Sequence, residues 1–213
     1  TTCVSIAVNK YGVNNVATVS VFYGQRLDKE IEGARKIAKY YGLKHYELNL
    51  AELYKFSDCT LLKTGEKVIK KSYSEQVKEL KEGHITSYVP FRNGAMISAV
   101  AALAIGLYPK DKVDIFLGAH ASDWAYADCS KDFLNKMNEA VQAGTYGNIS
   151  LVAPLADMTK TQVVARGIEL KTPYQYTWSC YEGGKKPCGK CGSCIDRAAA
   201  FKANGIKDPA LED

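Results

Sequence analysis

Four cysteines near the end of the chain have the spacing of a metal site. They are Cys180, Cys188, Cys191 and Cys194, separated by seven, two and two residues. Thiolates are soft, strongly donating ligands, and four of them fill the coordination shell of a tetrahedral zinc ion. Glycines between the ligands would let the chain turn sharply there. The spacing therefore predicts a closed zinc site, which stabilises structure and leaves no open position for catalysis.

Two other uses of these cysteines remain open. An iron–sulfur cluster is compatible with the spacing, and disulfides could join the same thiols. Against disulfides, the chain has an odd number of cysteines, seven, the other three are scattered, and no signal-peptide pattern precedes them. We therefore expect a cytoplasmic zinc protein. The charge of a four-thiolate zinc site could be offset by neighbouring cations, namely Lys185, Lys186, Lys190 and Arg197.

A second group of residues could recognise a purine-like base. Asp123 and Asp128 lie in one segment with Trp124 and Tyr126. A carboxylate can accept two N–H donors from the edge of a guanine-like ring while an aromatic side chain stacks on its face. The same residues could instead form a polar capping loop with both rings turned into the core. His120 precedes them, and the sequence alone assigns it no role.

The composition fits an ordinary globular domain. The chain has 213 residues, 46% of them hydrophobic and 24% charged, which is enough to bury a full core. No apolar run approaches the length of a membrane span, so no membrane partner is expected. The net charge of +5 suits anionic small molecules or RNA, but equally a solvated lysine surface.

The rest of the sequence alternates between predicted strands and helices. Apolar, β-branched runs predict strands at 16–23, 44–50, 113–117 and 149–153, and apolar positions at helical spacing predict helices at 1–8, 29–41, 93–104, 133–143 and 159–170. The 93–104 helix is apolar nearly all round, so we expect it to be buried. This alternation predicts an α/β fold with an open, doubly wound, mainly parallel sheet.

The pattern also suggests a domain organisation. Residues 51–88 carry scattered lysines and few large apolar side chains, which predicts a long excursion that could be a lid or a solvated insertion. We expect an α/β nucleotide-binding domain at 1–175 and a zinc-binding hairpin element at 176–213. Ligands bind beyond the carboxyl ends of the strands in such sheets, where segments 23–26, 118–129 and 154–160 are expected.

Several motifs together carry a family resemblance. They are Thr177-Trp178-Ser179-Cys180-Tyr181, Cys188-Gly189-Lys190-Cys191-Gly192-Ser193-Cys194 with Arg197, Val89-Pro90-Phe91-Arg92-Asn93, and Asp123, Tyr126 and Asp128-Cys129. Over essentially its whole length the chain resembles the 7-cyano-7-deazaguanine synthases, the QueC family of the queuosine pathway. The resemblance implies a PP-loop ATP pyrophosphatase with an adenine-nucleotide-hydrolase fold, a four-cysteine zinc site and a homodimeric assembly.

The resemblance also implies an activity. Family members convert 7-carboxy-7-deazaguanine to its nitrile with ammonia and two molecules of ATP, and magnesium is expected. ATP adenylates the carboxylate, ammonia displaces AMP to give the amide, and a second adenylation lets AMP leave as the nitrile forms. No protein nucleophile is needed, so the protein must supply positioning and charge stabilisation.

Site residues follow from their positions in the family motifs. Arg92 and Lys160 are the candidates for contacts with phosphates or leaving groups. The nucleotide is expected at Thr1, Thr2, Tyr23, Gly24 and Gln25, and the deazaguanine at Asp123, Tyr126 and Asp128. The first helix would present its N-terminal backbone amides to the ATP phosphates.

The sequence departs from the family pattern in a few places. Family members begin with a strand and a Ser-Gly-Gly-x-Asp-Ser loop that runs into Thr, and the sequence starts at that Thr. Leu27, Ala127 and Ser130 stand where His, Pro and Arg are usual. We therefore expect the given residues to bind zinc but to turn over ATP negligibly until they are extended upstream.

Two other functions remain open. One is a PP-loop enzyme that activates a tRNA base for thiolation or amidation, with the lysines of 63–81 on the RNA. The other is a non-catalytic, zinc-stabilised binding module. Asp128 and the Trp-Ser-Cys-Tyr context of Cys180 favour the deazaguanine reaction, so we expect a small-molecule substrate and not a nucleic acid.

Overall fold

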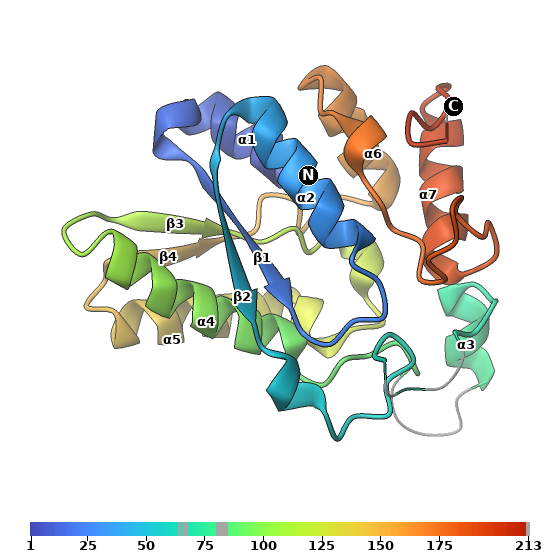
Figure 1. Ribbon diagram of the computed structural model, residues 1–213, viewed down its shortest axis with the longest axis horizontal. Coiled ribbons are helices and arrows are strands. Elements are labelled where there is room, and N and C mark those ends of the chain that lie inside the picture. The colour runs from blue at the N-terminus through green and yellow to red at the C-terminus, as the bar shows by residue number, and fades with distance from the viewer. Residues whose placement is uncertain (64, 66–67, 80–84, 212–213) are drawn as a thin grey trace. The chain divides into compact units, whose positions relative to one another are not determined.

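The protein is described by a computed structural model that covers residues 1–63, 65, 68–79 and 85–211. The chain divides into two compact units, the first formed by Thr1–Pro90 with Lys160–Asp213 and the second by Phe91–Thr159. Each unit contains one pair of parallel strands with helices beside it (Figure 1). The predicted α/β class is therefore confirmed. Among the described helices none is long and apolar enough to cross a membrane.

The first unit is built around the parallel strands β1 (Ala17–Phe22) and β2 (Lys44–Asn49). Helix α2 (Lys29–Tyr41) connects them and has the bounds that its apolar spacing predicts. Gly42 ends it with φ 69°, a left-handed conformation that glycine adopts without strain. A short helical connection between two parallel strands is the expected crossover unit.

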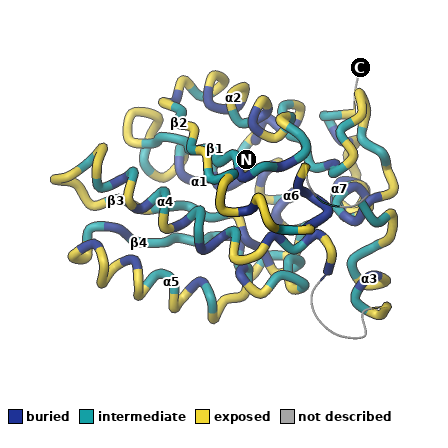
Figure 2. The backbone as a smooth tube through the Cα atoms, turned by 60° about the horizontal axis from the view of Figure 1, so that its bottom comes forward, coloured by how far each residue is buried: buried dark blue, intermediate teal, exposed yellow. Residues whose placement is uncertain are grey.

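Strand β1 is less buried than its sequence predicts. All six of its residues are half-buried, as the intermediate colour in Figure 2 shows. Among the described strands β1 pairs only with β2, so one of its edges has no strand partner there. An edge strand keeps part of its backbone and side chains accessible. The expectation of a fully buried strand is therefore wrong for β1.

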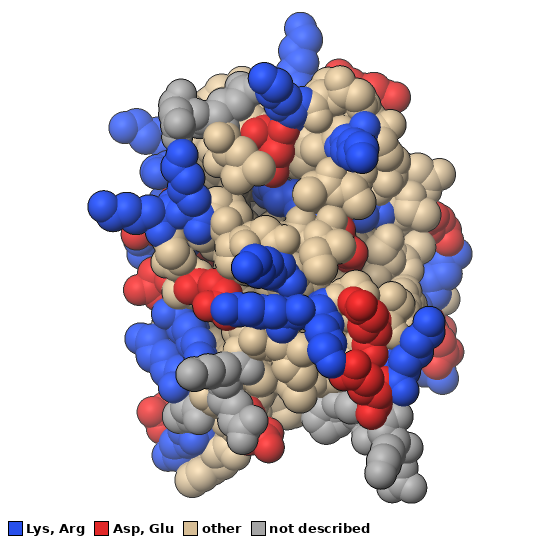
Figure 3. Space-filling view, turned by 90° about the vertical axis from the view of Figure 1, so that its right-hand side faces the viewer, with Lys and Arg blue, Asp and Glu red and all other residues tan. Residues whose placement is uncertain are grey.

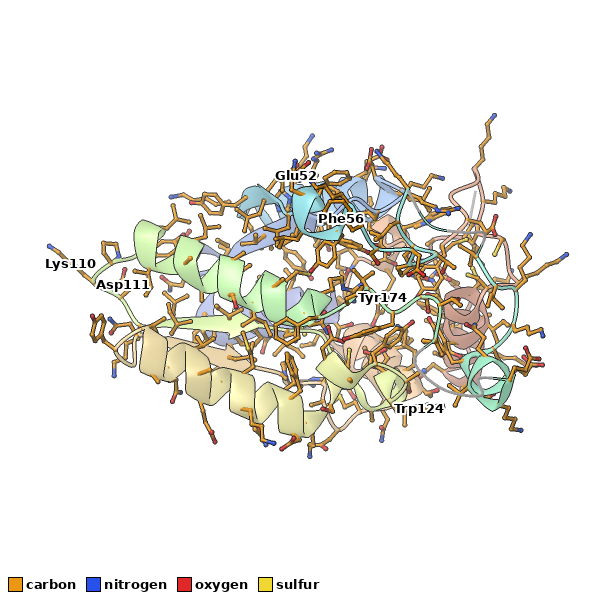
Figure 4. All side chains as sticks on the ribbon, turned by 90° about the horizontal axis from the view of Figure 1, so that it is seen from below. Glu52, Phe56, Lys110, Asp111, Trp124 and Tyr174 are labelled. Atoms are coloured by element: carbon orange, nitrogen blue, oxygen red, sulfur yellow. The ribbon has the colours of Figure 1, made fainter. Side chains whose placement is uncertain are left out.

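Three further helices of the first unit pack together: α1 (Thr2–Tyr11), α6 (Lys160–Glu169) and α7 (Gly192–Ala203). Helix α6 packs against both of the others. Their core contains Val164, Tyr174, Ala200 and Phe201, and the Tyr174 and Phe201 rings meet edge to face at 5.3 Å. Tyr174, labelled in Figure 4, is 8% exposed. Its hydroxyl group lies 2.8 Å from Thr2 Oγ1, which satisfies both polar groups inside the core.

The second unit contains the parallel strands β3 (Val113–Phe116) and β4 (Ile149–Val152) and the helices α4 (Arg92–Leu107) and α5 (Lys131–Gly144). The core cluster comprises Ile97, Ala101, Ala104, Val141 and Ile149. Helix α4 buries one stripe of residues, while Ser98, Ala102 and Leu107 are exposed. The expectation that α4 is buried all round is therefore wrong, because within this unit it packs through one face only.

The 51–88 segment contains more structure than its sequence suggests. It includes the 3-10 helix η2 (Ala51–Tyr54) and the helix α3 (Tyr73–Glu79). Leu62 is 2% exposed and Ile85 is 1% exposed, so parts of the segment belong to the core of the first unit. Residues 64, 66–67 and 80–84 lie outside the described chain. The lid-like role, and the expected division at residue 175, stay predictions.

His45 on β2 makes the stability of the fold sensitive to pH. Its Nδ1 lies 2.8 Å from Thr18 Oγ1, and its Nε2 lies 3.7 Å from Glu47 Oε1. Burial lowers the pKa of His45, and the nearby Arg35 guanidinium adds to this effect while Glu47 opposes it. The folded protein therefore binds a proton at His45 less readily than the unfolded chain does.

We predict that this contribution to stability is complete above the unfolded pKa of about 6.5 and is lost as the pH falls below it. The free energy of unfolding, measured by urea titration across this range, should decrease less on acidification in His45→Gln than in the natural sequence. Equal acid sensitivity of the two proteins would contradict the prediction.

Candidate active site and metal centre

The four predicted metal ligands come together in the first unit. The Sγ atoms of Cys180, Cys188, Cys191 and Cys194 all lie within 4.8 Å of one another. Ligands of a tetrahedral zinc ion with Zn–S bonds of about 2.3 Å are about 3.8 Å apart, so the cluster has the right size. Cys188 is half-buried and the other three are buried. These residues could therefore hold a metal ion such as zinc in a closed site.

The local backbone explains how the thiols converge. Cys191 precedes the first turn of α7 and Cys194 lies within it, so the element is a loop followed by a helix and not a two-stranded hairpin. Gly189, with φ 69°, reverses the chain between ligands. Backbone N–H groups of Lys190 and Cys191 donate to Cys188 Sγ at 3.4 and 3.3 Å. N–H donors of this kind stabilise a thiolate.

The electrostatics of the cluster also suit a cation. Burial raises the pKa of the Cys194 thiol, so a positive charge among the sulfurs is needed to deprotonate it. At Cys188 burial acts in the same direction, but the N–H donors and neighbouring thiols outweigh it and lower the pKa to about 7. Arg197, expected to offset the charge of the site, instead pairs with Asp208 through contacts of 2.5 and 2.7 Å. Its guanidinium therefore binds the Asp208 carboxylate and not the thiolates.

The metal element is attached to the 51–88 segment. The hydroxyl groups of Tyr73 on α3 and Tyr181 are 2.6 Å apart, and the Tyr73 ring covers Gly192 at the start of α7. Helices α3 and α7 accordingly lie close to each other in Figure 1. This contact could not be predicted from local sequence patterns, because the two tyrosines are 108 residues apart.

The element also contacts the beginning of α2. Lys29 Nζ lies 3.9 Å from the centre of the Trp178 ring and donates to the carbonyl oxygen of Gly184. Leu27, where the family resemblance predicts a histidine, lies against Gly183, where an added Cβ would overlap its side chain. Leu27 thus has a packing role in this chain.

The segment predicted to bind the nucleotide forms a tight turn after β1. Gln25 is 5% exposed, and its Oε1 accepts the Tyr23 N–H at 2.7 Å. Gly24 has φ 87°, and its carbonyl oxygen accepts the N–H of Lys63 at 3.1 Å. Arg26 donates from Nε to Leu62 O at 2.6 Å. The Gln25 side chain therefore holds the turn, which leaves backbone groups as the more available contacts for a nucleotide.

Thr1, Thr2 and Lys160 are brought together in the first unit. Thr2 is buried against Tyr174, while Thr1 is exposed at the N-terminal end of α1. Lys160 is the first residue of α6, and it lies close enough for its charge to act at the N-terminal end of α1. The first N–H groups of a helix lack intrahelical acceptors and favour anions. A cation beside a helix N-terminus is an arrangement that suits phosphate.

Asp128 has a structural role of the kind that the capping-loop alternative predicts. Its Oδ2 accepts the backbone N–H of Asn93 at 2.8 Å, and the Asn93 side-chain amide donates to Asp128 O at 3.0 Å. Both residues are buried. Asp128 therefore caps the N-terminus of α4 from another part of the chain. Among the described residues no hydrogen bond to its second oxygen, Oδ1, is found.

Arg92, the first residue of α4, follows a phenylalanine in a strained conformation. Phe91 precedes α4 with φ 52°, a left-handed conformation that is strained for a phenylalanine. Its ring lies against Gly94, where an added Cβ would overlap it, and meets the Phe133 ring edge to face at 5.8 Å. Backbone strain of this kind is frequent at functional sites.

Asp123, Tyr126 and Asp128 lie in the turns that follow β3. Tyr126 is half-buried and precedes the 3-10 helix η4 (Ala127–Cys129), and Trp124 is 62% exposed (Figure 4). The alternative in which both aromatic rings enter the core therefore does not hold for Trp124. Burial, then the charges of Asp123 and Asp128, raise the pKa of Cys129 to about 12, and Arg92 opposes them. The three predicted charged residues of this unit thus all act electrostatically on one half-buried thiol.

Known proteins match this chain over most of its length. Residues 1–205 match the family model described as queuosine biosynthesis protein QueC. A protein of Archaeoglobus fulgidus named 7-cyano-7-deazaguanine synthase is 38% identical over 204 residues, which cover 95% of this chain and 82% of that protein. Proteins of the same name from Picrophilus torridus and Methanosarcina barkeri are 38% and 34% identical, with 98% of this chain covered and 87% and 91% of theirs.

The chain belongs to the QueC family. The match spans both units and includes all the predicted site residues. The resemblance drawn from the sequence motifs is therefore confirmed. The roles of individual QueC-family residues in this chain remain predictions, because family membership does not test them one by one.

The metal centre yields a direct prediction. Cys191 has 0% exposure, and we expect one zinc ion per chain bound by it and the other three thiols. Cys191→Ser should lose most of the zinc and loosen the 180–197 region, with little change in the rest of the first unit. Elemental analysis and hydrogen exchange of that region measure both effects. Iron with visible absorbance, or no metal in the natural sequence, would overturn the prediction.

Proposed function

We propose that this chain converts 7-carboxy-7-deazaguanine and ammonia to 7-cyano-7-deazaguanine at the expense of ATP. The observation that carries the proposal is the match to the QueC family across the whole chain, to relatives that bear the name of this activity. The buried Asp128 supports it, because an acceptor fixed beyond a strand end suits the N–H edge of a deazaguanine.

The described residues suggest how the work is divided. In the first unit, Lys160 and the N-terminus of α1 would bind phosphate groups and stabilise the charge that develops as pyrophosphate leaves. In the second unit, Arg92 would offset negative charge near the reacting carboxylate, while Asp123, Tyr126 and Asp128 would hold the base. Magnesium would enter with ATP, bound to its phosphates.

Membership of the family also suggests the metal, the location and the oligomeric state of the protein. The four cysteines would hold zinc as a structural ion, since a site with four thiolates offers no position to a substrate. We also propose that the protein is a cytoplasmic homodimer.

The alternative of an RNA substrate has weaker support. It depends on the lysines of 63–81, but Lys71 pairs with Glu79 at 2.6 Å and Lys70 lies 3.9 Å from Glu182. On the face in Figure 3, Asp and Glu side chains are interspersed among the Lys and Arg side chains. Mixed charges of this kind are typical of a solvated surface. A steeply salt-dependent affinity for unmodified tRNA would be the result that favours this alternative.

The test of the function is to incubate the full-length protein with magnesium ATP, ammonium and the deazaguanine acid, and to detect the nitrile by mass. AMP and pyrophosphate should form only when the acid is present. Nucleotide hydrolysis independent of the acid, or modification of tRNA in place of the free base, would overturn the proposal.

Asp128 allows structure and recognition to be separated. In Asp128→Asn the side-chain oxygen can still accept the Asn93 N–H, but the other atom becomes a donor that faces a donor of the base. We predict that Asp128→Asn raises the KM for the acid by about 10- to 100-fold and leaves thermal stability and ATP binding nearly unchanged. Asp128→Ala is the matched control, which should lose stability as well because the α4 cap is gone. Equal losses for acid and ATP in Asp128→Asn would show that the residue is only structural.

A further inference from the structure

The side chain of Asn93 joins the first turn of α4 to the 3-10 helix η4. It belongs to a residue that is 6% exposed, and its Nδ2 donates to the carbonyl oxygen of Asp128 at 3.0 Å and to Cys129 Sγ at 3.2 Å. On its other side Oδ1 accepts from Arg92 Nη2 at 3.5 Å. One buried amide therefore contacts three residues, two of which, Arg92 and Asp128, belong to the predicted site.

The chemistry of these neighbours determines which end of the amide faces each of them. A carbonyl oxygen is only an acceptor, so the NH2 group has to face Asp128 O. A guanidinium group is only a donor, so the amide oxygen faces Arg92. An aspartate at this position would present an acceptor to the Asp128 carbonyl, and a leucine would satisfy neither neighbour. The contacts on both sides thus require an asparagine.

The backbone of Asn93 has a separate task. Its N–H donates to Asp128 Oδ2 at 2.8 Å and so provides the cap on α4 with its partner. This bond does not involve the Asn93 side chain, so it can persist in Asn93→Ala. The carboxylate and the main-chain carbonyl of Asp128 are therefore held by two different groups of one residue. The side-chain bonds determine how η4 lies against α4, with which it packs.

We propose that Asn93 is a positioning residue for recognition of the deazaguanine and that it acts through Asp128. This inference rests on the proposed function. The bond to the Asp128 carbonyl fixes the backbone from which the carboxylate projects, and the cap fixes one carboxylate oxygen. The other oxygen, Oδ1, then keeps one direction before the base arrives, so binding does not have to order it. The Asn93 side chain needs no contact with the base for this role.

The same amide restrains Arg92, although more weakly. Their contact of 3.5 Å is at the limit of hydrogen-bond distance. It nevertheless places the guanidinium and the base-recognising carboxylate on either side of one buried group. The main effect of the Asn93 side chain is therefore expected on binding of the acid through Asp128.

A purely structural asparagine lies in the same unit and serves as the matched control. Asn138 on α5 accepts the N–H of Leu151 on β4 through Oδ1 at 2.8 Å. Asn138→Ala deletes the same group as Asn93→Ala and should also lower the thermal stability of the protein. Because Leu151 has no part in the predicted site, the affinity for the acid should stay within about twofold of that of the natural sequence.

The experiment is a double-mutant cycle on the full-length protein. Affinity for 7-carboxy-7-deazaguanine is measured by calorimetry with magnesium and a non-hydrolysable ATP analogue present. We expect Asn93→Ala and Asp128→Asn each to weaken binding by about 10-fold or more. The double variant should bind no more than about threefold more weakly than the worse of the two single variants, because Asn93 acts through Asp128. Affinity for the ATP analogue alone should change less than about twofold.

Asn93→Asp tests the orientation of the amide and covers the case in which Asn93→Ala does not fold. It keeps the shape of the side chain and the acceptor for Arg92, but it loses the donor to the Asp128 carbonyl. Its affinity for the acid should fall by about 10-fold or more as well.

Each result decides between defined alternatives. Losses that multiply in the double variant, or an unchanged affinity for the acid in Asn93→Ala or Asn93→Asp, would show that the inference is wrong. An equal loss of affinity for the acid in Asn138→Ala would also contradict it, because any loss of stability would then have the same effect. A natural sequence that binds the acid but forms no nitrile would overturn the proposed function, while the cycle would still test Asn93. Absence of any binding of the acid would overturn both.

Discussion

Each candidate site depends on one constraint, that the first N–H groups of a helix have no acceptor within the helix. The N-termini of α1, α4 and α7 meet this constraint in different ways. At α4 the carboxylate of Asp128 accepts the Asn93 N–H, and at α7 the first turn carries Cys194 and follows Cys191. The N-terminus of α1 has Lys160 beside it, which suits a phosphate ligand. A helix dipole favours negative charge in each case.

The cap on α4 ties recognition to folding. A capping side chain contributes about 1 kcal/mol to stability, and a charged acceptor inside the protein contributes at the upper end of that range. Because Oδ2 of Asp128 is fixed in this way, its other oxygen is fixed too, with no flexible side chain to order when a ligand arrives. The strained Phe91 lies one residue before the same helix, so the stability of the cap also helps to maintain the conformation that places Arg92.

Local patterns made part of this structure predictable. The bounds of α2 follow from apolar spacing and Gly42, and the cysteine cluster follows from short spacings that limit how far the thiols can separate. Features that depend on distant partners could not be read in this way. Asp128 caps α4, which begins at Arg92, 36 residues earlier in the sequence. Its hydrogen-bond partner Asn93 is 35 residues away. Arg197 lies near the cysteines in sequence, but its partner is Asp208.

The burial of Leu62 also depends on residues that are distant in sequence, namely those of the turn after β1. This turn is in its own way linked to the metal element. Leu62 is buried because its segment pairs with the turn at Gly24 and Arg26. Lys29 begins the next helix and rests on Trp178 in the loop that leads to Cys180. A metal held by the four thiols would therefore restrain that loop, through it the start of α2, and through α2 the turn where the nucleotide is expected. The cysteines are far in sequence from the turn after β1, where the nucleotide is expected. Direct contacts within the first unit nevertheless allow a metal at the cysteines to stabilise that turn.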